Sequence, residues 1–423
     1  MNRFVHMVQN NSFVRNVAVL ATGTALGQAL IVVASPVLSR LYDPTAFGTL
    51  AVIIAIASPV TQIGTLQYTS AIVLAKRLED AVNLVILSAG LAISTALIVT
   101  AVLFAAGDWI AEAFGDSAAA PLLLFAPGFA LIVCLSDVLS AWANRKRSYK
   151  VIAGSNIGRS ACTVFVQILM GLLDGAAKGL ALGRIVGLAF GLGMLALGLR
   201  RPWSLTLSSI NFNSLKSVAR EHSQFPKYTM PRELLVSLSG SATTILIAFF
   251  FSPASAGLYW FARRLLEAPK TVISTSVRRV FYRTAVSLHH DNHSLLPLLT
   301  KTTLYLLAIG ALPTVPIVLF GPDIFDLVFG SEWRKAGSYA QWLILWWISS
   351  FVLVGASALA PILELQRGTL IIEMIGLGLR MAGLSVGVLL VNDVLAIALY
   401  SIAGLLTNIG RQAYVFHHVI KTR

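Results

Sequence analysis

Long apolar segments, separated by short polar connections, recur along the chain from residue 17 to residue 416. A helix needs about 20 consecutive, mostly apolar residues to cross a bilayer. By that measure the pattern predicts twelve transmembrane helices, at residues 17–38, 46–75, 81–107, 118–142, 151–173, 176–199, 229–252, 257–282, 297–321, 337–361, 368–390 and 394–416. The first segment is too long for the core of a signal peptide, so we expect it to be retained as a helix.

The composition agrees with this pattern. Charged residues make up only 12% of the chain and hydrophobic residues 57%, whereas soluble domains average roughly 25% charged residues. A net charge of +14 would suggest a nucleic-acid partner in a soluble protein. The sequence has no compact basic region with interleaved aromatic residues, so we expect no nucleic-acid partner. The sequence predicts an all-α polytopic membrane protein.

Basic residues are concentrated in alternate connections between the predicted helices. The basic connections carry Lys76, Arg77, Arg145, Lys146, Arg147, Lys150, Arg200, Arg201, Lys216, Arg220, Lys227, Arg283, Lys301 and Arg367. The other connections carry mainly acidic residues: Asp108, Glu112, Asp116, Asp174, Asp323, Asp326 and Asp393. Since cytoplasmic connections are enriched in Lys and Arg, we expect both termini and the connection at 200–228 to be cytoplasmic.

The second half of the chain repeats landmarks of the first half in the same order. Residues 43–48 and 252–257 each join two predicted helices, and in each a Pro is followed four residues later by Gly. Further matching landmarks are Phe114-Gly115 and Phe329-Gly330, Arg147 and Arg367, and Arg159 and Arg380. Six helices per half make this a parallel repeat. We expect an N-terminal six-helix lobe at 1–199, a cytoplasmic connection at 200–228, a C-terminal six-helix lobe at 229–423, and a cavity between the lobes.

The predicted helix at 257–282 carries an unusual group of charges. Arg263, Glu267 and Lys270 are four and three residues apart, so a helix places them on one face, and Arg264 lies at the edge of that face. A charge at the centre of a membrane helix costs about 2.5–3.5 kcal/mol. We therefore predict a water-filled basic cavity that receives an anion. The alternative is a helix end whose long side chains extend to the lipid headgroups.

Other charged residues also lie deep inside predicted helices. The predicted substrate-binding residues are Arg159, Arg184, Arg263, Arg264, Lys270 and Arg380. The predicted gating or charge-pairing residues are Asp137, Glu267 and Glu373. Because cations outnumber carboxylates, this set favours phosphate or another anion, which an Arg side chain can bind with two hydrogen bonds. Charged residues near helix ends, namely Arg15, Arg40, Glu233 and Arg411, are interpreted as interface anchors.

Motifs of catalysis and cofactor binding are missing from the sequence. It has no P-loop, no GxGxxG motif after a strand and no HExxH motif. Cys134 and Cys162 lie in apolar segments and form no metal-binding or redox motif. His289, His290 and His293 cluster in a polar stretch that is typical of a solvated loop rather than a metal site. We expect a protein that is not an enzyme and that has no cofactor and no metal.

The first 90 residues resemble the Wzx-like polysaccharide flippases of the multidrug/oligosaccharidyl-lipid/polysaccharide exporter superfamily. The resemblance is carried by Gly23-Thr24, Gln28, residues 39–44, Phe47-Gly48, Tyr68, Ala71-Ile72 and residues 79–81, and in the second half by residues 257–259 and Arg263. It implies transfer of undecaprenyl-diphosphate-linked oligosaccharide to the outer leaflet of the bacterial inner membrane, by alternating access of two six-helix lobes. The implied partners are this polyprenyl-diphosphate-linked oligosaccharide, membrane lipids and other membrane proteins of polysaccharide assembly.

Other functions remain open at this point. A drug or cation antiporter of the same superfamily would need a cavity dominated by carboxylates, the reverse of the balance found here. A lipid II flippase would handle the same diphosphate headgroup. A membrane polysaccharide polymerase or ligase is disfavoured by the short outer connections.

Overall fold

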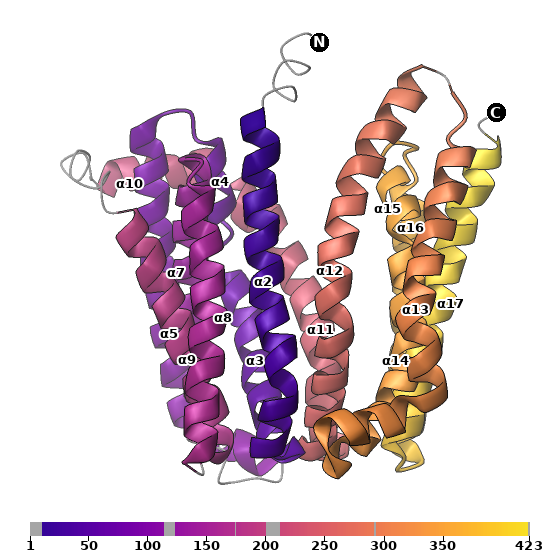
Figure 1. Ribbon diagram of the computed structural model, residues 1–423. Coiled ribbons are helices and arrows are strands. Elements are labelled where there is room, and N and C mark those ends of the chain that lie inside the picture. The colour runs from indigo at the N-terminus through magenta and orange to yellow at the C-terminus, as the bar shows by residue number, and fades with distance from the viewer. Residues whose placement is uncertain (1–10, 114–122, 174, 200–211, 292, 422–423) are drawn as a thin grey trace. The chain divides into compact units, whose positions relative to one another are not determined.

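In the computed structural model, every regular element within the described residues is a helix (Figure 1). The described residues are 11–113, 123–173, 175–199, 212–291 and 293–421. The predicted all-α fold class is confirmed. The predicted start of the fourth helix at 118, the landmark Phe114-Gly115 and residues 200–211 of the predicted connection lie outside the described residues.

The chain forms two compact units, Met1–Gly257 (unit 1) and Leu258–Arg423 (unit 2). Unit 1 contains α2 (Asn11–Leu41), α3 (Pro44–Gly64), α4 (Thr69–Leu74), α5 (Leu78–Ala113), α7 (Phe125–Arg145), α8 (Tyr149–Leu172), α9 (Ala176–Gly198), α10 (Phe212–Glu221), the π-helical turn η4 (Phe225–Thr229) and α11 (Met230–Phe250). Unit 2 contains most of α12 (Pro253–His290), then α13 (Leu296–Phe329), the 3₁₀ turn η5 (Ser331–Trp333), α14 (Arg334–Val352), α15 (Val354–Leu359), α16 (Gln366–Leu389) and α17 (Asp393–Lys421).

Unit 1 extends past the predicted lobe boundary at 229 because α11 packs against α3. The lobes at 1–199 and 229–423 and the connection at 200–228 therefore stay predictions.

In the described part of the chain, twelve long helices correspond to the twelve predicted segments. Within the described residues, nine helices are long and apolar enough to span a membrane: α2, α3, α5, α7, α9, α11 with η4, α13, α16 and α17. The other three are α8, α12 and α14, with 24, 38 and 19 residues. They miss that measure because they carry more charged and polar residues, and two of them carry predicted site residues.

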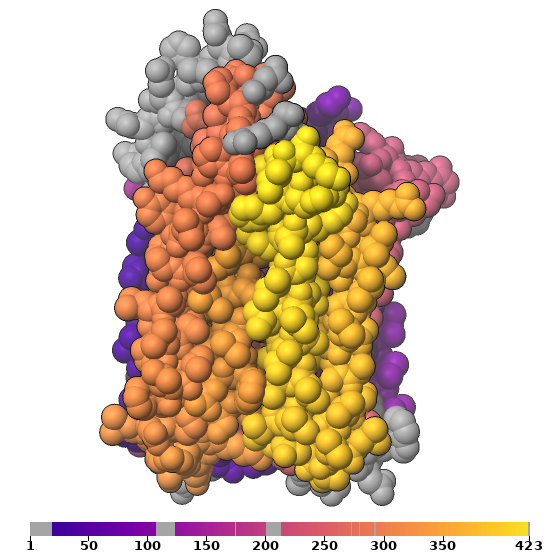
Figure 2. Space-filling view, turned by 90° about the vertical axis from the view of Figure 1, so that its right-hand side faces the viewer, coloured from indigo at the N-terminus to yellow at the C-terminus, as the bar shows by residue number. Residues whose placement is uncertain are grey.

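Large apolar side chains remain exposed on the outside of both units. On the face of unit 2 that Figure 2 presents, α17 lies between α13 and α16. Leu312 and Leu327 on α13 and Leu389 on α16 are 80%, 82% and 80% exposed. In unit 1, Phe104 on α5 is 83% exposed. Many large apolar side chains at this exposure suit contact with lipid rather than water, as a multi-pass membrane protein requires.

Two predicted helices are divided in the structure. α3 ends at Gly64, and α4 follows at Thr69 instead of continuing the segment predicted to reach residue 75. Leu66 and Gln67 between them have φ values of 46° and 60°, which a right-handed helix cannot include. The predicted helix at 337–361 is likewise divided into α14 and α15.

α13 extends past its predicted end at 321, with a kink at Phe320, whose φ is −129°. Pro322 lacks an N–H group and cannot donate to the carbonyl of Val318, four residues earlier. The Gln341 side chain on α14 donates to that carbonyl instead, with 2.8 Å between Nε2 and the oxygen. The neighbouring helix thus satisfies the acceptor that the proline leaves open.

The repeat landmarks at 43–48 and 252–257 build the same helix start. The Asp43 carboxylate accepts a hydrogen bond from the N–H three residues later, at 2.8 Å, and the Ser252 hydroxyl accepts one three residues later, at 3.0 Å. Pro44 and Pro253 are the first residues of α3 and α12, a position where the missing N–H of proline has no cost. The two halves therefore begin their second helices with the same capping geometry, as the internal repeat predicts.

The two helix starts also pack directly on each other within unit 1. A Cβ atom on Gly48 would lie 1.8 Å from the carbonyl oxygen of Pro253, and one on Gly257 would lie 2.0 Å from that of Pro44. Each glycine thus meets the proline of the other landmark, so the contact is reciprocal. Because the opposing atoms belong to the backbone, no side chain larger than hydrogen fits at either position.

Glycines also bring α9 close to α8. A Cβ atom on Gly183 would lie 2.5 Å from the Gln167 side chain, and one on Gly187 would lie 1.9 Å from the Thr163 hydroxyl. Small residues at four-residue spacing allow such close approach between membrane helices. This packing fixes the positions of Arg159 on α8 and Arg184 on α9.

Candidate functional site

The charged face predicted on α12 exists, and its first two members form an ion pair. Arg263 Nε donates to Glu267 Oε1 at 2.9 Å across one helical turn. The two side chains are 30% and 44% exposed, so a ligand could still reach both of them. Tyr259, one turn before Arg263, is completely buried. The ion pair therefore follows a tightly packed turn of α12, and its charged groups remain accessible.

Lys270 and Arg264 have other contacts. The Lys270 ammonium group donates to the Ser350 hydroxyl on α14, and this hydroxyl donates in turn to the Trp347 carbonyl oxygen at 2.8 Å. The Arg264 guanidinium carbon lies 4.8 Å from the centre of the Trp260 ring. Of the three cations predicted on this face, only Arg263 is hydrogen-bonded to Glu267.

A second charged group joins α16 and α17. Glu373 accepts a hydrogen bond from Arg380 at 2.7 Å and another from Arg411 at 2.8 Å. The Arg380 side chain is 11% exposed, that of Arg411 23% and that of Glu373 40%. Arg411, interpreted from the sequence as an interface anchor, shares this carboxylate with the more buried Arg380, and its role as an anchor stays a prediction.

Helix α14 connects the two groups. The Arg380 guanidinium carbon lies 5.7 Å from the centre of the Trp346 ring, and Trp346 packs edge-on against Tyr400 at 5.3 Å. Asn408 on α17 donates to Ser349 at 2.9 Å, and Ser349 precedes the residue that accepts from Lys270. We name this set the polar layer of unit 2; it consists of Arg263, Glu267, Lys270, Ser349, Ser350, Glu373, Arg380, Asn408 and Arg411. Its four cations and two carboxylates give a net charge of +2.

The predicted residues of unit 1 form a separate set. Asp137 on α7 and Arg159 on α8 interact electrostatically. The Arg184 guanidinium carbon on α9 lies 6.0 Å from the centre of the Phe129 ring on α7. The structure thus groups Asp137, Arg159 and Arg184 on neighbouring helices of one unit, and a joint role with the polar layer stays a prediction.

Sequence reasoning missed the neutral members of the polar layer, Ser349, Ser350 and Asn408. The two serines belong to α14, as does Trp346 against Arg380, and an ordinary apolar span was predicted there. Their signal was the run of Trp342, Trp346 and Trp347 followed by two serines. Aromatic and hydroxyl side chains on one helix offer partners to cations on the neighbouring helices.

The comparisons with known proteins give one family for the sequence and one fold for the structure. The sequence matches the polysaccharide biosynthesis protein family over residues 37–338. A lipid II flippase, MurJ, in an inward closed conformation matches with a TM-score of 0.72 and 11% identity, covering 95% of this chain and 89% of that chain. An inward-facing multidrug resistance MATE family transporter of the MOP superfamily matches with a TM-score of 0.67 and 15% identity, covering 95% of both chains.

A MOP superfamily transporter from Pyrococcus furiosus, whose binding pocket is described as having reverse polarity, matches with a TM-score of 0.61 and 14% identity, covering 96% of both chains. No curated protein sequence matches the chain. At these identities the structural matches show the fold of MOP superfamily transporters.

Proposed function

Because the chain belongs to the polysaccharide biosynthesis protein family, we propose that it is a flippase for undecaprenyl-diphosphate-linked oligosaccharide. It would move the repeat units of a surface polysaccharide, such as O-antigen, capsule or exopolysaccharide, across the bacterial inner membrane by alternating access. The family membership confirms the resemblance found in the first 90 residues. The transporter fold and the apolar outer surface support a multi-pass membrane protein.

The observation that carries this proposal is the polar layer of unit 2. Its charges lie on helices that otherwise suit a bilayer, where each costs about 2.5–3.5 kcal/mol unless it is paired or hydrated. Glu267 and Glu373 pair with three of the four cations. The remaining positive charge favours a negatively charged ligand, and a diphosphate fits because arginine binds two phosphate oxygens at once.

The contacts suggest how the layer exchanges partners. The Lys270 ammonium group is hydrogen-bonded to a neutral hydroxyl, so it can bind a phosphate without first displacing a carboxylate. Arg263 and Lys270 are seven residues apart, about 10.5 Å along the helix. A diphosphate is shorter than this distance, so it would contact the two cations in succession. As it reaches Arg263 it displaces Glu267, and the arginine stays paired throughout.

Glu373 can likewise give up an arginine to a phosphate, at the α16 and α17 end of the polar layer. It accepts hydrogen bonds from two arginines, so releasing Arg380 to a phosphate leaves Arg411 still paired. Arg264, Arg159 and Arg184 are proposed as further substrate contacts, and Asp137 as a further charge partner. The surplus of cations argues against the drug antiporter, which would require the reverse balance.

The loop charges support a topology in which both termini and the 200–228 connection are cytoplasmic. In that topology the His290 end of α12 faces the cytoplasm, and the Pro253 end faces the outside. The proposed partners are the lipid-linked oligosaccharide, the surrounding membrane lipids and other membrane proteins of polysaccharide assembly.

Inactivation of the gene in its own host tests the proposal. Lipid-linked oligosaccharide should accumulate in the cytoplasmic leaflet and surface polysaccharide should disappear, and the wild-type gene should restore both. An unchanged surface polymer combined with lower resistance to cationic dyes would favour the antiporter instead. Accumulation of the lipid-linked peptidoglycan precursor, with the surface polymer unchanged, would favour the lipid II flippase.

A further inference from the structure

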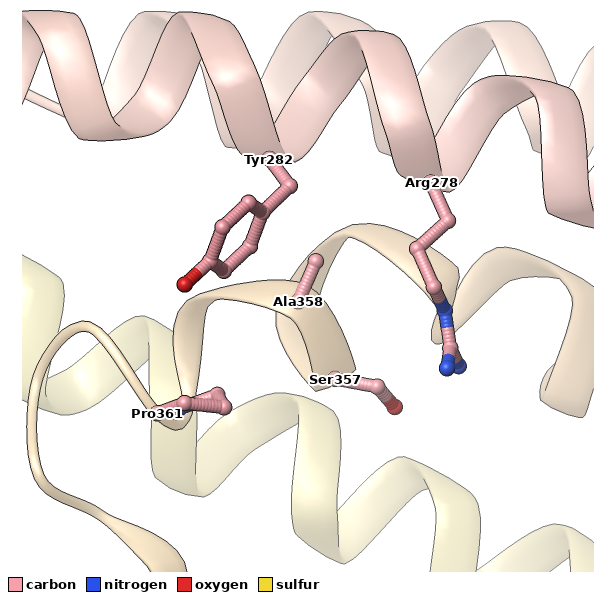
Figure 3. Close-up of a pocket in the computed structure, with 5 residues that line it drawn as sticks. All are labelled: Arg278, Tyr282, Ser357, Ala358 and Pro361. Carbon is pink, nitrogen blue, oxygen red and sulfur yellow. The ribbon is translucent and has the colours of Figure 1, made fainter. Parts of the chain in front are cut away.

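A pocket lies between α12 and α15, away from the polar layer (Figure 3). It has a volume of about 400 Å³ and is lined by Arg278, Tyr282, Ser357, Ala358 and Pro361. In Figure 3 the Arg278 guanidinium extends toward Ser357, and the Tyr282 hydroxyl extends toward Pro361. All five residues belong to unit 2. The pocket therefore combines one guanidinium group with two hydroxyl groups, and no carboxylate lines it.

Arg278 lies beside the charged face of α12, further along the helix. It follows Arg263 by fifteen residues, and its side chain starts about 60° round the helix from that of Arg263. It follows Lys270 by eight residues, about 12 Å along the axis and about 80° round it. Ser274 lies between them, about 40° round the helix from each. The pocket thus lies along one polar track with Arg263 and Lys270, nearer the end of α12 that the proposed topology assigns to the cytoplasm.

Arg278 differs from the arginines of the polar layer in its pairing. Arg263, Arg380 and Arg411 each form a salt bridge with a glutamate. Within the described part of the chain, Arg278 has no carboxylate within salt-bridge distance. The guanidinium group and the two hydroxyls are the donors that phosphate oxygens accept from. The volume falls within the range of roughly 300–1,000 Å³ that is typical of small-molecule sites.

The first half of the chain has a pocket at the equivalent place of the repeat. It has a volume of about 480 Å³ and is lined by Val73, Leu78, Asn144, Arg145, Lys146, Arg147 and Tyr149. Tyr282 follows Val73 by 209 residues, the same interval by which Pro253 follows Pro44. In both halves the pocket lies where the second and fourth predicted helices end. Both pockets are basic, so the position favours anions in each half.

We propose that the α12–α15 pocket is a loading site that binds the diphosphate of the lipid-linked oligosaccharide before it reaches the polar layer. Arg278 holds the phosphate oxygens, and Tyr282 and Ser357 donate hydrogen bonds to it. This inference rests on the proposed function, since it names the substrate group and the place where that group first binds. From the pocket the diphosphate moves about 12 Å along α12 to Lys270.

A crosslinking experiment separates this pocket from the polar layer. In cells that make the oligosaccharide, Tyr282→p-benzoylphenylalanine places a photoreactive group in the pocket of the full-length protein, because Tyr282 is a half-exposed aromatic residue of its lining. Irradiation should attach lipid-linked oligosaccharide to this position. The attachment should persist when Arg263→Gln is added, since that change acts later on the path. It should be lost when Arg278→Gln is added. Arg283→Gln is the matched control, because Arg283 is exposed on the same helix and does not line the pocket.

Binding to the purified protein measures how much Arg278 contributes to the affinity for the diphosphate. In nanodiscs of neutral lipid, Arg278→Gln should weaken binding of undecaprenyl diphosphate by about tenfold or more, because a hydrogen bond to a charged group is lost. Ser357→Ala should weaken it less, and Arg283→Gln should leave it unchanged. Phosphatidylglycerol should compete poorly with the diphosphate in every variant.

Several results would overturn the proposal. Crosslinks to phospholipid alone would make the pocket a site for an anionic membrane lipid. If wild type and Arg278→Gln bound undecaprenyl diphosphate equally and Arg263→Gln did not bind it, the binding site would be the polar layer. That result would reject the loading site and keep the proposed function. Failure of the wild-type protein to bind undecaprenyl diphosphate at all would reject the proposed function together with this pocket.

Discussion

Replacing Glu373 with glutamine removes the carboxylate that Arg380 and Arg411 share. Both arginines donate to it, at 2.7 and 2.8 Å, and Arg380 is only 11% exposed. Breaking a fully buried ion pair costs about 3–5 kcal/mol, whereas an exposed pair contributes no more than about 1 kcal/mol. Glu373 itself is 40% exposed, and glutamine keeps one acceptor oxygen. We therefore expect Glu373→Gln to destabilise the protein by about 2–3 kcal/mol.

Thermal unfolding of the purified protein in detergent measures this cost. Each kcal/mol shifts the Tm of a domain of 150–250 residues by about 2–4 °C, so Glu373→Gln should lower the Tm by about 4–12 °C. Glu79→Gln is the control, because Glu79 pairs with Arg77 at 3.0 Å with side chains 52% and 72% exposed. Its Tm should change by no more than about 4 °C.

The same variant tests the link between the polar layer and an anionic ligand. Undecaprenyl diphosphate should raise the Tm of Glu373→Gln more than that of wild type, because the phosphate supplies the missing negative charge. Equal Tm values for Glu373→Gln and Glu79→Gln would refute the role of Glu373 as a charge partner. An equal ligand-induced shift in Glu373→Gln and wild type would refute binding of the diphosphate at this group.

Three further predictions follow from the contacts and the loop charges. Arg263→Ala should abolish export at a normal protein level and Arg263→Lys should restore it only in part, whereas an arginine that merely reaches the headgroups would be fully replaced by lysine. Gly257→Ala should lower the Tm, because overpacking costs about 1–3 kcal/mol, whereas Gly378→Ala, with no atom within 4 Å of its new Cβ, should not. Tags at Asp326 should be reachable from outside the cell membrane and tags at Lys216 should not; the reverse pattern would reject the topology.

The apolar pattern was enough to predict the helices, but not where each one breaks. Segment length and hydropathy identify a span because the bilayer imposes both. The break after Gly64 depends on the positive φ values of Leu66 and Gln67, which neither residue type favours. At the kink of α13 the open carbonyl of Val318 accepts a hydrogen bond from Gln341, a residue of another helix. Local pattern contains no information about such a partner.

The site shows the same division between local and distant contacts. The Arg263–Glu267 pair could be predicted because its members are one helical turn apart. The partners of Lys270 and Glu373 could not, because Ser350 and Arg411 lie 80 and 38 residues away in the sequence. The repeat helped in one case, since the landmarks at Pro44 and Pro253 correctly predicted two matching helix starts.

Flipping by the purified protein in liposomes tests the central claim most directly. Lipid-linked oligosaccharide is placed in both leaflets, and a glycosidase added outside degrades the molecules that reach the outer leaflet. Wild-type protein should allow degradation of the whole pool, whereas liposomes with Arg263→Gln should lose only the molecules that began in the outer leaflet. If wild-type protein also leaves the inner-leaflet pool intact while the oligosaccharide still binds to it, the protein is not a flippase for this substrate.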